Sequence, residues 1–263
     1  MSDGTEFSRA IVCPPSDSYA RGLTSAQLGA PDLALARVQH AAYVAALEAA
    51  GARVTVLPAD TNYPDSTFVE DTAVVTAKGA ILCRPGAMSR AGEVVTMHAA
   101  LERLLGHAVN AITEPGTVDG GDICQAGSHF FIGLSARTNE AGADQLARWL
   151  HARGYSSSTV NLRNDPALLH LKSGLVWLGG SQLLAVGSLA TRAVLSEFDV
   201  VEVPADEAYA ANSVRVNKVL LVPAGYPALS AKLTAMGHRV VPLEMSEFRK
   251  MDGGLSCLSI RVP

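Results

Sequence analysis

Residues 122–162 have the sequence DICQAGSHFFIGLSARTNEAGADQLARWLHARGYSSSTVNL, which contains one complete structural unit. Residues 122–125 and 129–134 are short apolar runs that predict two strands joined by a turn. Thr138 can cap a helix that continues to about Arg153, and Gly154 ends it. Residues 159–162 predict a further strand. The stretch therefore predicts a hairpin, a helix and a strand in that order.

The same order recurs along the rest of the chain. Helices are predicted to begin near residues 31, 89, 139, 191 and 227, and each is followed within a few residues by an apolar strand. Most units add a hairpin before the next helix, which does not fit the strict alternation of a doubly wound sheet. Five units of roughly 50 residues suggest an internal repeat. No linker divides the chain, so we expect an α/β fold with a single domain, residues 1–263, of five ββαβ-like units.

The composition of the 263 residues excludes several classes of protein. Hydrophobic residues make up 48% and charged residues 17%, which is incompatible with intrinsic disorder. A net charge of −4 argues against a nucleic-acid partner. The first residues lack an apolar signal segment, and glycines and serines interrupt the uncharged stretch 173–190, so it predicts two buried strands and not a membrane span. We expect a cytoplasmic protein without a membrane partner.

An acidic stretch occurs at residues 64–71, PDSTFVED. Asp65, Glu70 and Asp71 lie at the start of a predicted strand, on which Phe68 and Glu70 would share one face while Asp71 points to the other. Buried carboxylates without partners are costly, and a cationic ligand would remove that cost. The alternative is a solvated acidic turn, or carboxylates paired with nearby arginines.

Two further stretches place polar groups beside glycines or within apolar sequence. Residues 117–122, TVDGGD, contain two acids and two glycines but match no phosphate-binding loop, and a simple turn is the alternative. His170 and Lys172 alternate with leucines on a predicted strand, so both would lie on one face. A single histidine in an apolar strand is more often a structural residue than a catalyst.

Four cysteines occur, and none forms a C-x-x-C pair, so neither a zinc ribbon nor a disulfide scaffold is expected. Cys257 differs from the others because the loop MDGG, residues 251–254, leads to it. Together the stretches supply a thiol, an imidazole and several acids, and a catalytic cysteine requires an acid–base partner and an orienting carboxylate. Carboxylates beside a thiol suit a cationic electrophile, whereas an acyl substrate would require oxyanion donors.

Six stretches in this order carry a resemblance to a known family: 65–71, 84–90, 117–122, 131–139, 169–173 and 251–257. From about residue 9 to residue 262, the chain resembles the dimethylarginine dimethylaminohydrolases of the guanidine-modifying (pentein) superfamily. The resemblance implies the pentein fold, a five-fold pseudo-symmetric α/β propeller, which agrees with the five predicted units.

The resemblance also implies roles for individual residues. Cys257 would be the nucleophile, His170 the general acid and then the base, and Asp119 the acid that orients His170, where some relatives have glutamate. No metal or organic cofactor would take part. Because acids surround it, Cys257 would be mainly neutral until a cationic substrate binds.

The implied substrate contacts surround the two ends of an amino acid with a guanidinium group. Residues 14–30 would form a lid. The contacts are Asp65, Phe68, Glu70 and Asp71 for the guanidinium, Arg90 and Arg137 for the carboxylate, and the carbonyls of Leu23 and Met251 for the α-amino group.

The implied activity is hydrolysis of Nω-methylated L-arginine to L-citrulline and dimethylamine or methylamine through a covalent thiouronium. The partner would be this small molecule, and the chain a monomer or homodimer. The alternative is an arginine deiminase-like hydrolase of unmethylated arginine, which the absence of a helical insertion disfavours. Two arginines for a carboxylate disfavour agmatine. A guanidinium-binding module without activity is a further alternative, and the set Cys257, His170 and Asp119 argues against it.

Overall fold

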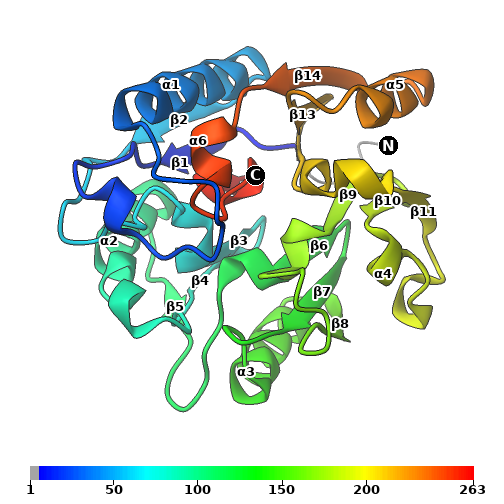
Figure 1. Ribbon diagram of the computed structural model, residues 1–263. Coiled ribbons are helices and arrows are strands. Elements are labelled where there is room, and N and C mark those ends of the chain that lie inside the picture. Colours follow the sequence, from blue (N-terminus) through cyan, green and yellow to red (C-terminus); the bar gives the residue numbers. More distant parts are fainter. Residues whose placement is uncertain (1–5) are drawn as a thin grey trace.

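The computed structural model describes residues 6–263, and the strands within them form five three-stranded sheets arranged in a ring (Figure 1). In each sheet, the first strand is antiparallel to the middle strand, and the middle strand is parallel to the third. The predicted five-fold α/β propeller is therefore confirmed.

The stretch 122–162 forms one of these units as predicted. It contains β6 (Ile123–Ala126), β7 (His129–Leu134), α3 (Glu140–His151) and β8 (Ser156–Asn161). Leu146 and Leu150 of α3 are fully buried against the sheet, and each such side chain contributes roughly 1.5–3 kcal/mol by leaving water. The helix is capped by Asn139 and not by Thr138, because the Asn139 side chain accepts from Gly142 N–H.

Three other units repeat this arrangement, with a helix after the middle strand of each sheet. They comprise β3 (Ala73–Thr76), β4 (Gly79–Leu82), α2 (Glu93–Leu105) and β5 (Asn110–Ala111); β9 (Leu175–Gly179), β10 (Gln182–Ala185), α4 (Gly187–Ala190) and β11 (Asp199–Glu202); and β12 (Val214–Val216), β13 (Val219–Pro223), α5 (Pro227–Ala235) and β14 (Arg239–Leu243). Four further short helices or helical turns are η1 (Tyr19–Arg21), η3 (Met88–Arg90), η6 (Ala193–Leu195) and α6 (Ser246–Arg249).

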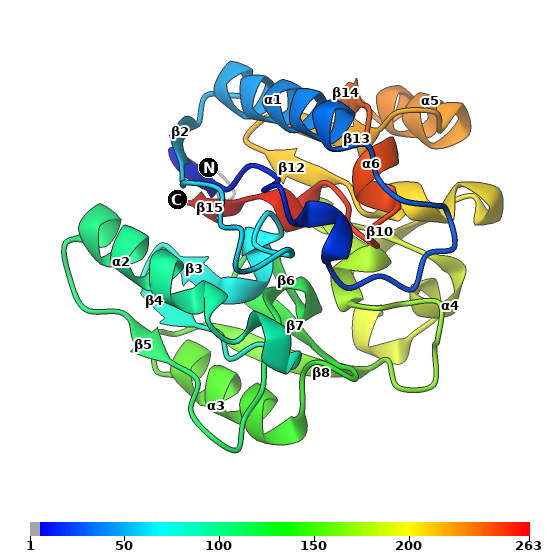
Figure 2. The ribbon, with the colours of Figure 1, turned by 60° about the vertical axis from the view of Figure 1, so that its left-hand side comes forward.

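Both ends of the chain build the fifth sheet. β1 (Arg9–Val12) is followed by α1 (Leu33–Ala49) and pairs in parallel with β2 (Arg53–Val56). The last strand, β15 (Ile260–Val262), lies antiparallel on the other edge of β1 (Figure 2). The sequence predicts a last strand over residues 256–262, but the pairing of β15 with β1 is a finding of the structure.

A short 3-10 turn precedes the first strand of every sheet. These turns are η2 (Val69–Thr72), η4 (Gly120–Asp122), η5 (Leu171–Ser173), η7 (Ala205–Ala211) and η8 (Ser256–Leu258). The sequence also predicts strands over 67–76, 168–178 and 256–262, and these predictions were wrong at their N-terminal ends, where the structure has η2, η5 and η8. In η2, Thr72 Oγ1 donates to Val69 O at 2.6 Å, and such a bond from a side chain to the local backbone competes with strand pairing.

The uncharged stretch 173–190 contributes β9 and β10, as the sequence predicts, followed by the short helix α4. Among residues 6–263, no helix has the length and apolar character that crossing a membrane requires.

Candidate active site

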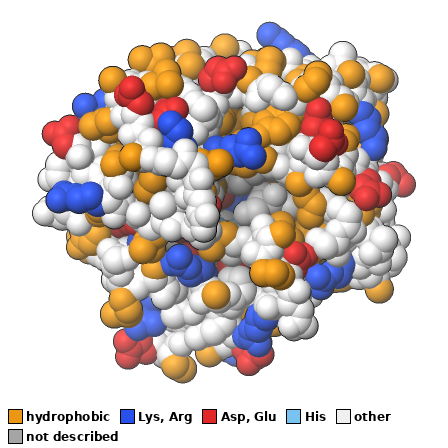
Figure 3. All heavy atoms as spheres, in the orientation of Figure 1, with side chains coloured by type: hydrophobic (Ala, Val, Ile, Leu, Met, Phe, Trp, Pro, Cys, Tyr) orange, Lys and Arg blue, Asp and Glu red, His pale blue; other side chains and the backbone are white. Residues whose placement is uncertain are grey.

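The face of the molecule seen in Figure 1 is hollowed near its middle (Figure 3). A pocket of about 400 Å³ lies among the 3-10 turns, the segment before α1 and the loop before β15. It contains every predicted site residue except Glu70. The lining residues are Leu23, Asp65, Phe68, Asp71, Arg90, Asp119, Arg137, Leu169, His170, Met251, Asp252, Gly253 and Cys257.

Cys257 belongs to η8, and its thiol faces the pocket. Burial raises the pKa of this thiol to about 12, and the carboxylates of Glu70 and Asp71 add to the effect. The thiol is therefore neutral near pH 7, in keeping with the expectation from the sequence. The other cysteines are buried and line no part of this pocket.

His170 lies directly before η5 and pairs with Asp119, which lies directly before η4. Asp119 Oδ2 is 3.0 Å from His170 Nε2, and Asp119 Oδ1 accepts from Gly86 N–H at 2.8 Å. Burial by itself would lower the pKa of His170. The charge of Asp71 and the hydrogen bond to Asp119 outweigh it, and the pKa rises to about 9. The imidazole is thus protonated at neutral pH, while Cys257 is not ionised.

Gly121 explains part of the glycine pair in TVDGGD. A Cβ added to Gly121 would lie 2.7 Å from His170 Nδ1 and 2.9 Å from Asp71 Oδ1. Any side chain would therefore push the imidazole away from its position. The glycine is required for close packing against the imidazole, and a simple turn does not account for it.

Asp71 and Arg90 form a buried ion pair. Gly121 N–H donates to Asp71 Oδ1 at 2.8 Å. Burial would raise the pKa of Asp71, but His170, Arg90 and this N–H lower it to about 2. The alternative that an acid of this stretch pairs with an arginine is thus confirmed for Asp71.

The two predicted carboxylate-binding arginines differ. Besides the pair with Asp71, the Arg90 guanidinium donates to Glu93 at 2.8 Å and to Phe68 O at 2.9 Å. The Arg137 guanidinium has no hydrogen bond or ion pair with any residue in the described range 6–263 and is partly exposed. Arg137 is therefore the arginine that is open to a ligand, whereas Arg90 is held by acids.

Asp65 is buried and accepts two hydrogen bonds from Leu23 N–H, at 3.0 and 3.2 Å. Burial raises its pKa, opposed by Arg90 and by the Leu23 N–H. This contact attaches the segment before α1 to the pocket rim. Asp252, which the sequence interpretation missed although it belongs to the MDGG loop, holds the same segment by accepting from Ser25 Oγ at 2.9 Å.

Glu70 lies outside the pocket, contrary to its predicted place beside the guanidinium. A 3-10 helix has three residues per turn, so Phe68 and Asp71 share one side of the chain while Glu70 points elsewhere. Its Oε1 pairs with Lys172 Nζ at 2.6 Å and with Arg261 Nη2 at 3.0 Å. The prediction that His170 and Lys172 share a face is wrong for the same reason.

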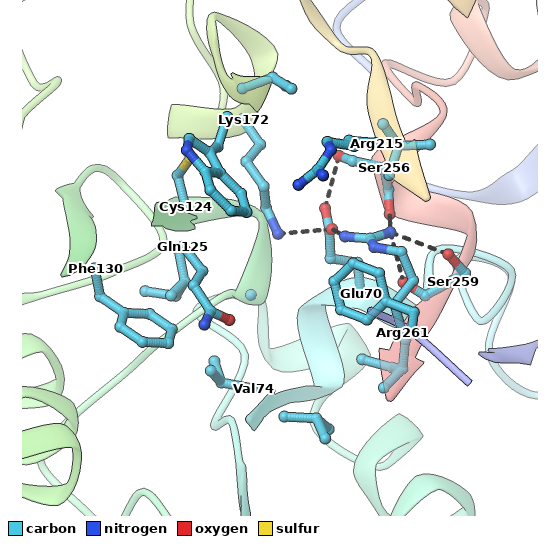
Figure 4. Close-up of a pocket in the computed structure, with 18 of the residues that line it drawn as sticks. Glu70, Val74, Cys124, Gln125, Phe130, Lys172, Arg215, Ser256, Ser259 and Arg261 are labelled. Carbon is cyan, nitrogen blue, oxygen red and sulfur yellow. Dashed lines mark hydrogen bonds and ion pairs between the residues drawn. The ribbon is translucent and has the colours of Figure 1, made fainter. Parts of the chain in front are cut away.

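Glu70, Lys172 and Arg261 line a separate cavity of about 820 Å³ (Figure 4). Glu70 Oε2 accepts from Ser256 Oγ at 2.8 Å, and Arg261 donates to Ser259 Oγ at 3.0 Å. Ser256 directly precedes the pocket thiol. Glu70 therefore supports the Cys257 turn from behind and faces away from the pocket.

One group of side chains could hold a metal ion. Single ligand atoms of Asp71, Asp119 and His170 lie within 4.8 Å of one another. Each already has a protein partner, since Asp71 pairs with Arg90, and Asp119 and His170 pair with each other. The donor set also suits a cationic organic group.

The comparisons with known proteins agree with this geometry. Residues 61–220 match the family model described as arginine deiminase. The chain is 44% identical over 255 residues to the dimethylarginine dimethylaminohydrolase of Pseudomonas aeruginosa, covering 97% of this chain and 99% of that protein. The chain belongs to the dimethylarginine dimethylaminohydrolase family. Another dimethylarginine dimethylaminohydrolase, from Streptomyces coelicolor, is 37% identical over 97% of this chain and 96% of its own length.

Solved structures of dimethylarginine dimethylaminohydrolases share the fold. A cysteine-to-serine variant of the Pseudomonas aeruginosa enzyme, complexed with citrulline, matches with a TM-score of 0.94 at 43% identity, covering 98% of this chain and 100% of that one. An arginine dihydrolase domain, ArgZ, matches with a TM-score of 0.87 at 22% identity, covering 97% of each chain, and shows the fold alone.

Proposed function

We propose that this chain hydrolyses Nω-methylated L-arginine, as asymmetric dimethylarginine or monomethylarginine, to L-citrulline and dimethylamine or methylamine. The observation that carries the proposal is one pocket that combines a neutral thiol, a protonated imidazole and buried carboxylates. The named activity of the relatives and the citrulline complex of one of them support it.

Substrate binding would use the acids and the open arginine. Asp65 and Asp71 would face the guanidinium cation, and Phe68 would pack on its plane. Arg137 would take the carboxylate. Arg90 would contribute to the carboxylate site only after giving up some of its contacts with Asp71 and Glu93. The carbonyls of Leu23 and Met251 would accept from the α-amino group.

In the first half of the reaction, the bound cation offsets the negative charge around Cys257, and the thiol proton passes to solvent. The thiolate sulfur forms a bond to the guanidinium carbon. His170 gives its proton to the methylated nitrogen, and the C–N bond breaks as the neutral amine leaves. This leaves a thiouronium on Cys257 and a neutral imidazole.

In the second half, His170 takes a proton from water, whose oxygen bonds to the same carbon. The C–S bond breaks, its electron pair returns to sulfur, and the sulfur takes up the remaining proton of the former water, so the carbon keeps the oxygen as the ureido carbonyl of citrulline. The pair with Asp119 favours the protonated imidazole, so the second half restores the starting state.

The test is citrulline release from asymmetric dimethylarginine, monomethylarginine, arginine and agmatine, measured side by side. We expect both methylarginines to react, with arginine and agmatine far slower. Cys257→Ser should bind methylarginine without turnover. Faster release from arginine would support the deiminase alternative, and turnover by Cys257→Ser would refute the assignment of the nucleophile.

We further propose that residues 1–263 act as one catalytic domain. Support comes from the pocket, whose residues come from the turns before the first strands of four sheets, from the loops before α2 and α3, and from the segment between β1 and α1. We also propose a cytoplasmic location, since four unpaired cysteines suit a reducing compartment.

A further inference from the structure

The catalytic turn is supported by η7, an element that contributes no residue to the pocket lining. Asn212 follows η7 directly and is 6% exposed. Its side-chain Nδ2 lies 3.8 Å from Cys257 Sγ and is oriented to donate to it. Nothing in the pattern of the sequence singles out Asn212, and the substrate contacts implied by the resemblance do not include it.

The orientation of the Asn212 amide is fixed by its other contact. Ser256 N–H donates to Asn212 Oδ1 at 2.9 Å. A backbone N–H can donate only to the oxygen of the amide, so the NH2 group must face the sulfur of Cys257. The same side chain thus holds the backbone before the nucleophile and presents a donor to the nucleophile itself.

Packing keeps the amide in this place. A Cβ on Gly254 would overlap the Asn212 side chain, so the loop can close over the amide only with glycine at this position. This contact accounts for the second glycine of the MDGG loop. Tyr209, which lies on η7, supports the neighbouring residue of the loop, because its hydroxyl donates to Gly253 O at 2.8 Å.

We propose that the Asn212 amide is a catalytic hydrogen-bond donor that stabilises the Cys257 thiolate. The sulfur lies among carboxylates, with Glu70 behind it and Asp71 in front, so its negative charge needs donors. A neutral amide supplies one without adding a cation that would repel a guanidinium substrate. The catalytic consequence rests on the proposed function, whereas the contact between amide and sulfur does not.

The test is alkylation of Cys257 by iodoacetamide at pH 8, followed by mass spectrometry of the labelled peptide in the substrate-free protein. This readout needs no turnover, so it is independent of the proposed activity. Asn212→Asp keeps an acceptor for Ser256 N–H but puts a carboxylate oxygen beside the sulfur. Asn212→Ala removes both contacts, and Tyr209→Phe is the control that weakens the loop and leaves the amide intact.

We expect Asn212→Asp to lower the alkylation rate constant about tenfold. Loss of the donor and gain of a negative charge together raise the pKa of the Cys257 thiol by about two pH units, which lowers the thiolate fraction about 100-fold. The higher nucleophilicity of the more basic thiolate recovers about tenfold of this. By the same reasoning, Asn212→Ala should react about threefold more slowly than the wild type.

A merely structural role predicts the opposite direction, because a loosened loop exposes the thiol and speeds its alkylation. Tyr209→Phe should therefore react at least as fast as the wild type. Wild-type or faster rates in both Asn212 variants would overturn the proposal, as would a tenfold loss in Tyr209→Phe.

Discussion

Three carboxylates surround the imidazole of His170 and keep it protonated. Asp71, Asp119 and Asp122 all raise its pKa against the effect of burial. Only Asp119 has a direct hydrogen bond to the ring. Asp122 instead accepts from Thr138 Oγ1 at 2.6 Å, so it acts on the imidazole through its charge. The charge of the imidazole thus depends on several residues, and its orientation mainly on one.

Asp119→Asn should separate these two contributions. Gly86 N–H and His170 contact different oxygens of Asp119, and in asparagine an NH2 group replaces one of these two acceptors. We expect kcat to fall roughly 10- to 100-fold. A positioned general acid usually contributes about 10²–10⁴-fold to the rate, and the variant keeps part of this contribution. The basic limb of the pH profile of kcat/KM should also move to lower pH.

Asp119→Glu is the matched control, because it keeps the charge and lengthens the side chain. Its basic limb should stay near that of the wild-type protein, with a smaller loss of kcat. An Asp119→Asn enzyme with an unchanged pH profile would show that Asp119 does not set the proton affinity of His170.

The raised pKa of His170 also predicts how stability depends on pH. The folded protein holds this proton up to about pH 9, whereas the unfolded chain releases it near the ordinary value of 6.5. The stabilisation is therefore fully present below pH 6.5 and is lost as the pH rises to about 9. A shift of this size corresponds to about 3 kcal/mol.

Denaturant unfolding at a series of pH values measures this effect. The free energy of unfolding of the wild-type protein should fall by about 3 kcal/mol more than that of His170→Gln between pH 6.5 and 9.5. Subtracting the variant removes the titration of the cysteines, which both proteins share. Parallel curves for the two proteins would contradict a raised pKa.

At the residue scale, the sequence predicts which side chains belong to the site better than it predicts where each side chain points. Residue types and order single out Cys257, His170 and Asp119, and the structure brings them to one pocket. The place of Glu70 could not be predicted, because its direction depends on whether residues 69–72 form a strand or a turn. Asn212 follows two alanines and precedes a serine, with no pattern to mark it.

At the scale of elements, the 3-10 turns determine which side chains reach the pocket. Helix α1 was predictable, because apolar residues recur along it and Gly51 follows its end. The turns were not predictable, because their residues continue into strands without a change in composition. Hydrogen bonds of side chains, which a pattern of hydrophobicity does not record, fix these turns: Thr72 Oγ1 donates to Val69 O in η2, and Leu171 N–H of η5 donates to Asp122 Oδ1 of η4.

Gly121→Ala tests the close packing of η4 against η5. The added methyl would force His170 Nδ1 or Asp71 Oδ1 to move by several tenths of an ångström. We expect kcat to fall at least about tenfold, because proton transfer depends on alignment. Gly187→Ala is the control, since its Cβ would meet only the flexible carboxylate end of Glu202, and neither residue lines the pocket. Equal activities of the two variants would contradict this account.

At the scale of the whole molecule, both ends of the chain close the ring. Ser8 N–H donates to Val262 O at 3.0 Å, and Ile11 pairs with Ile260. This contact joins residues about as far apart in sequence as the chain allows, so local patterns could not predict it. The turn η8 directly precedes β15, and ring closure therefore holds Cys257 in place.

Two rearrangements of the chain should then have opposite outcomes. A circular permutant that joins Pro263 to Glu6 by a flexible linker, and opens between the exposed residues Gly106 and His107, keeps every strand pair. We expect it to fold and to release citrulline within about threefold of the wild-type rate, as openings at exposed loops usually permit. Deletion of residues 260–263 removes two buried side chains, each worth roughly 1.5–3 kcal/mol, and unpairs one edge of β1. We expect it to lower Tm and abolish activity. Circular dichroism during heating and the citrulline assay check both; an active truncated chain would show that Cys257 needs no closed ring.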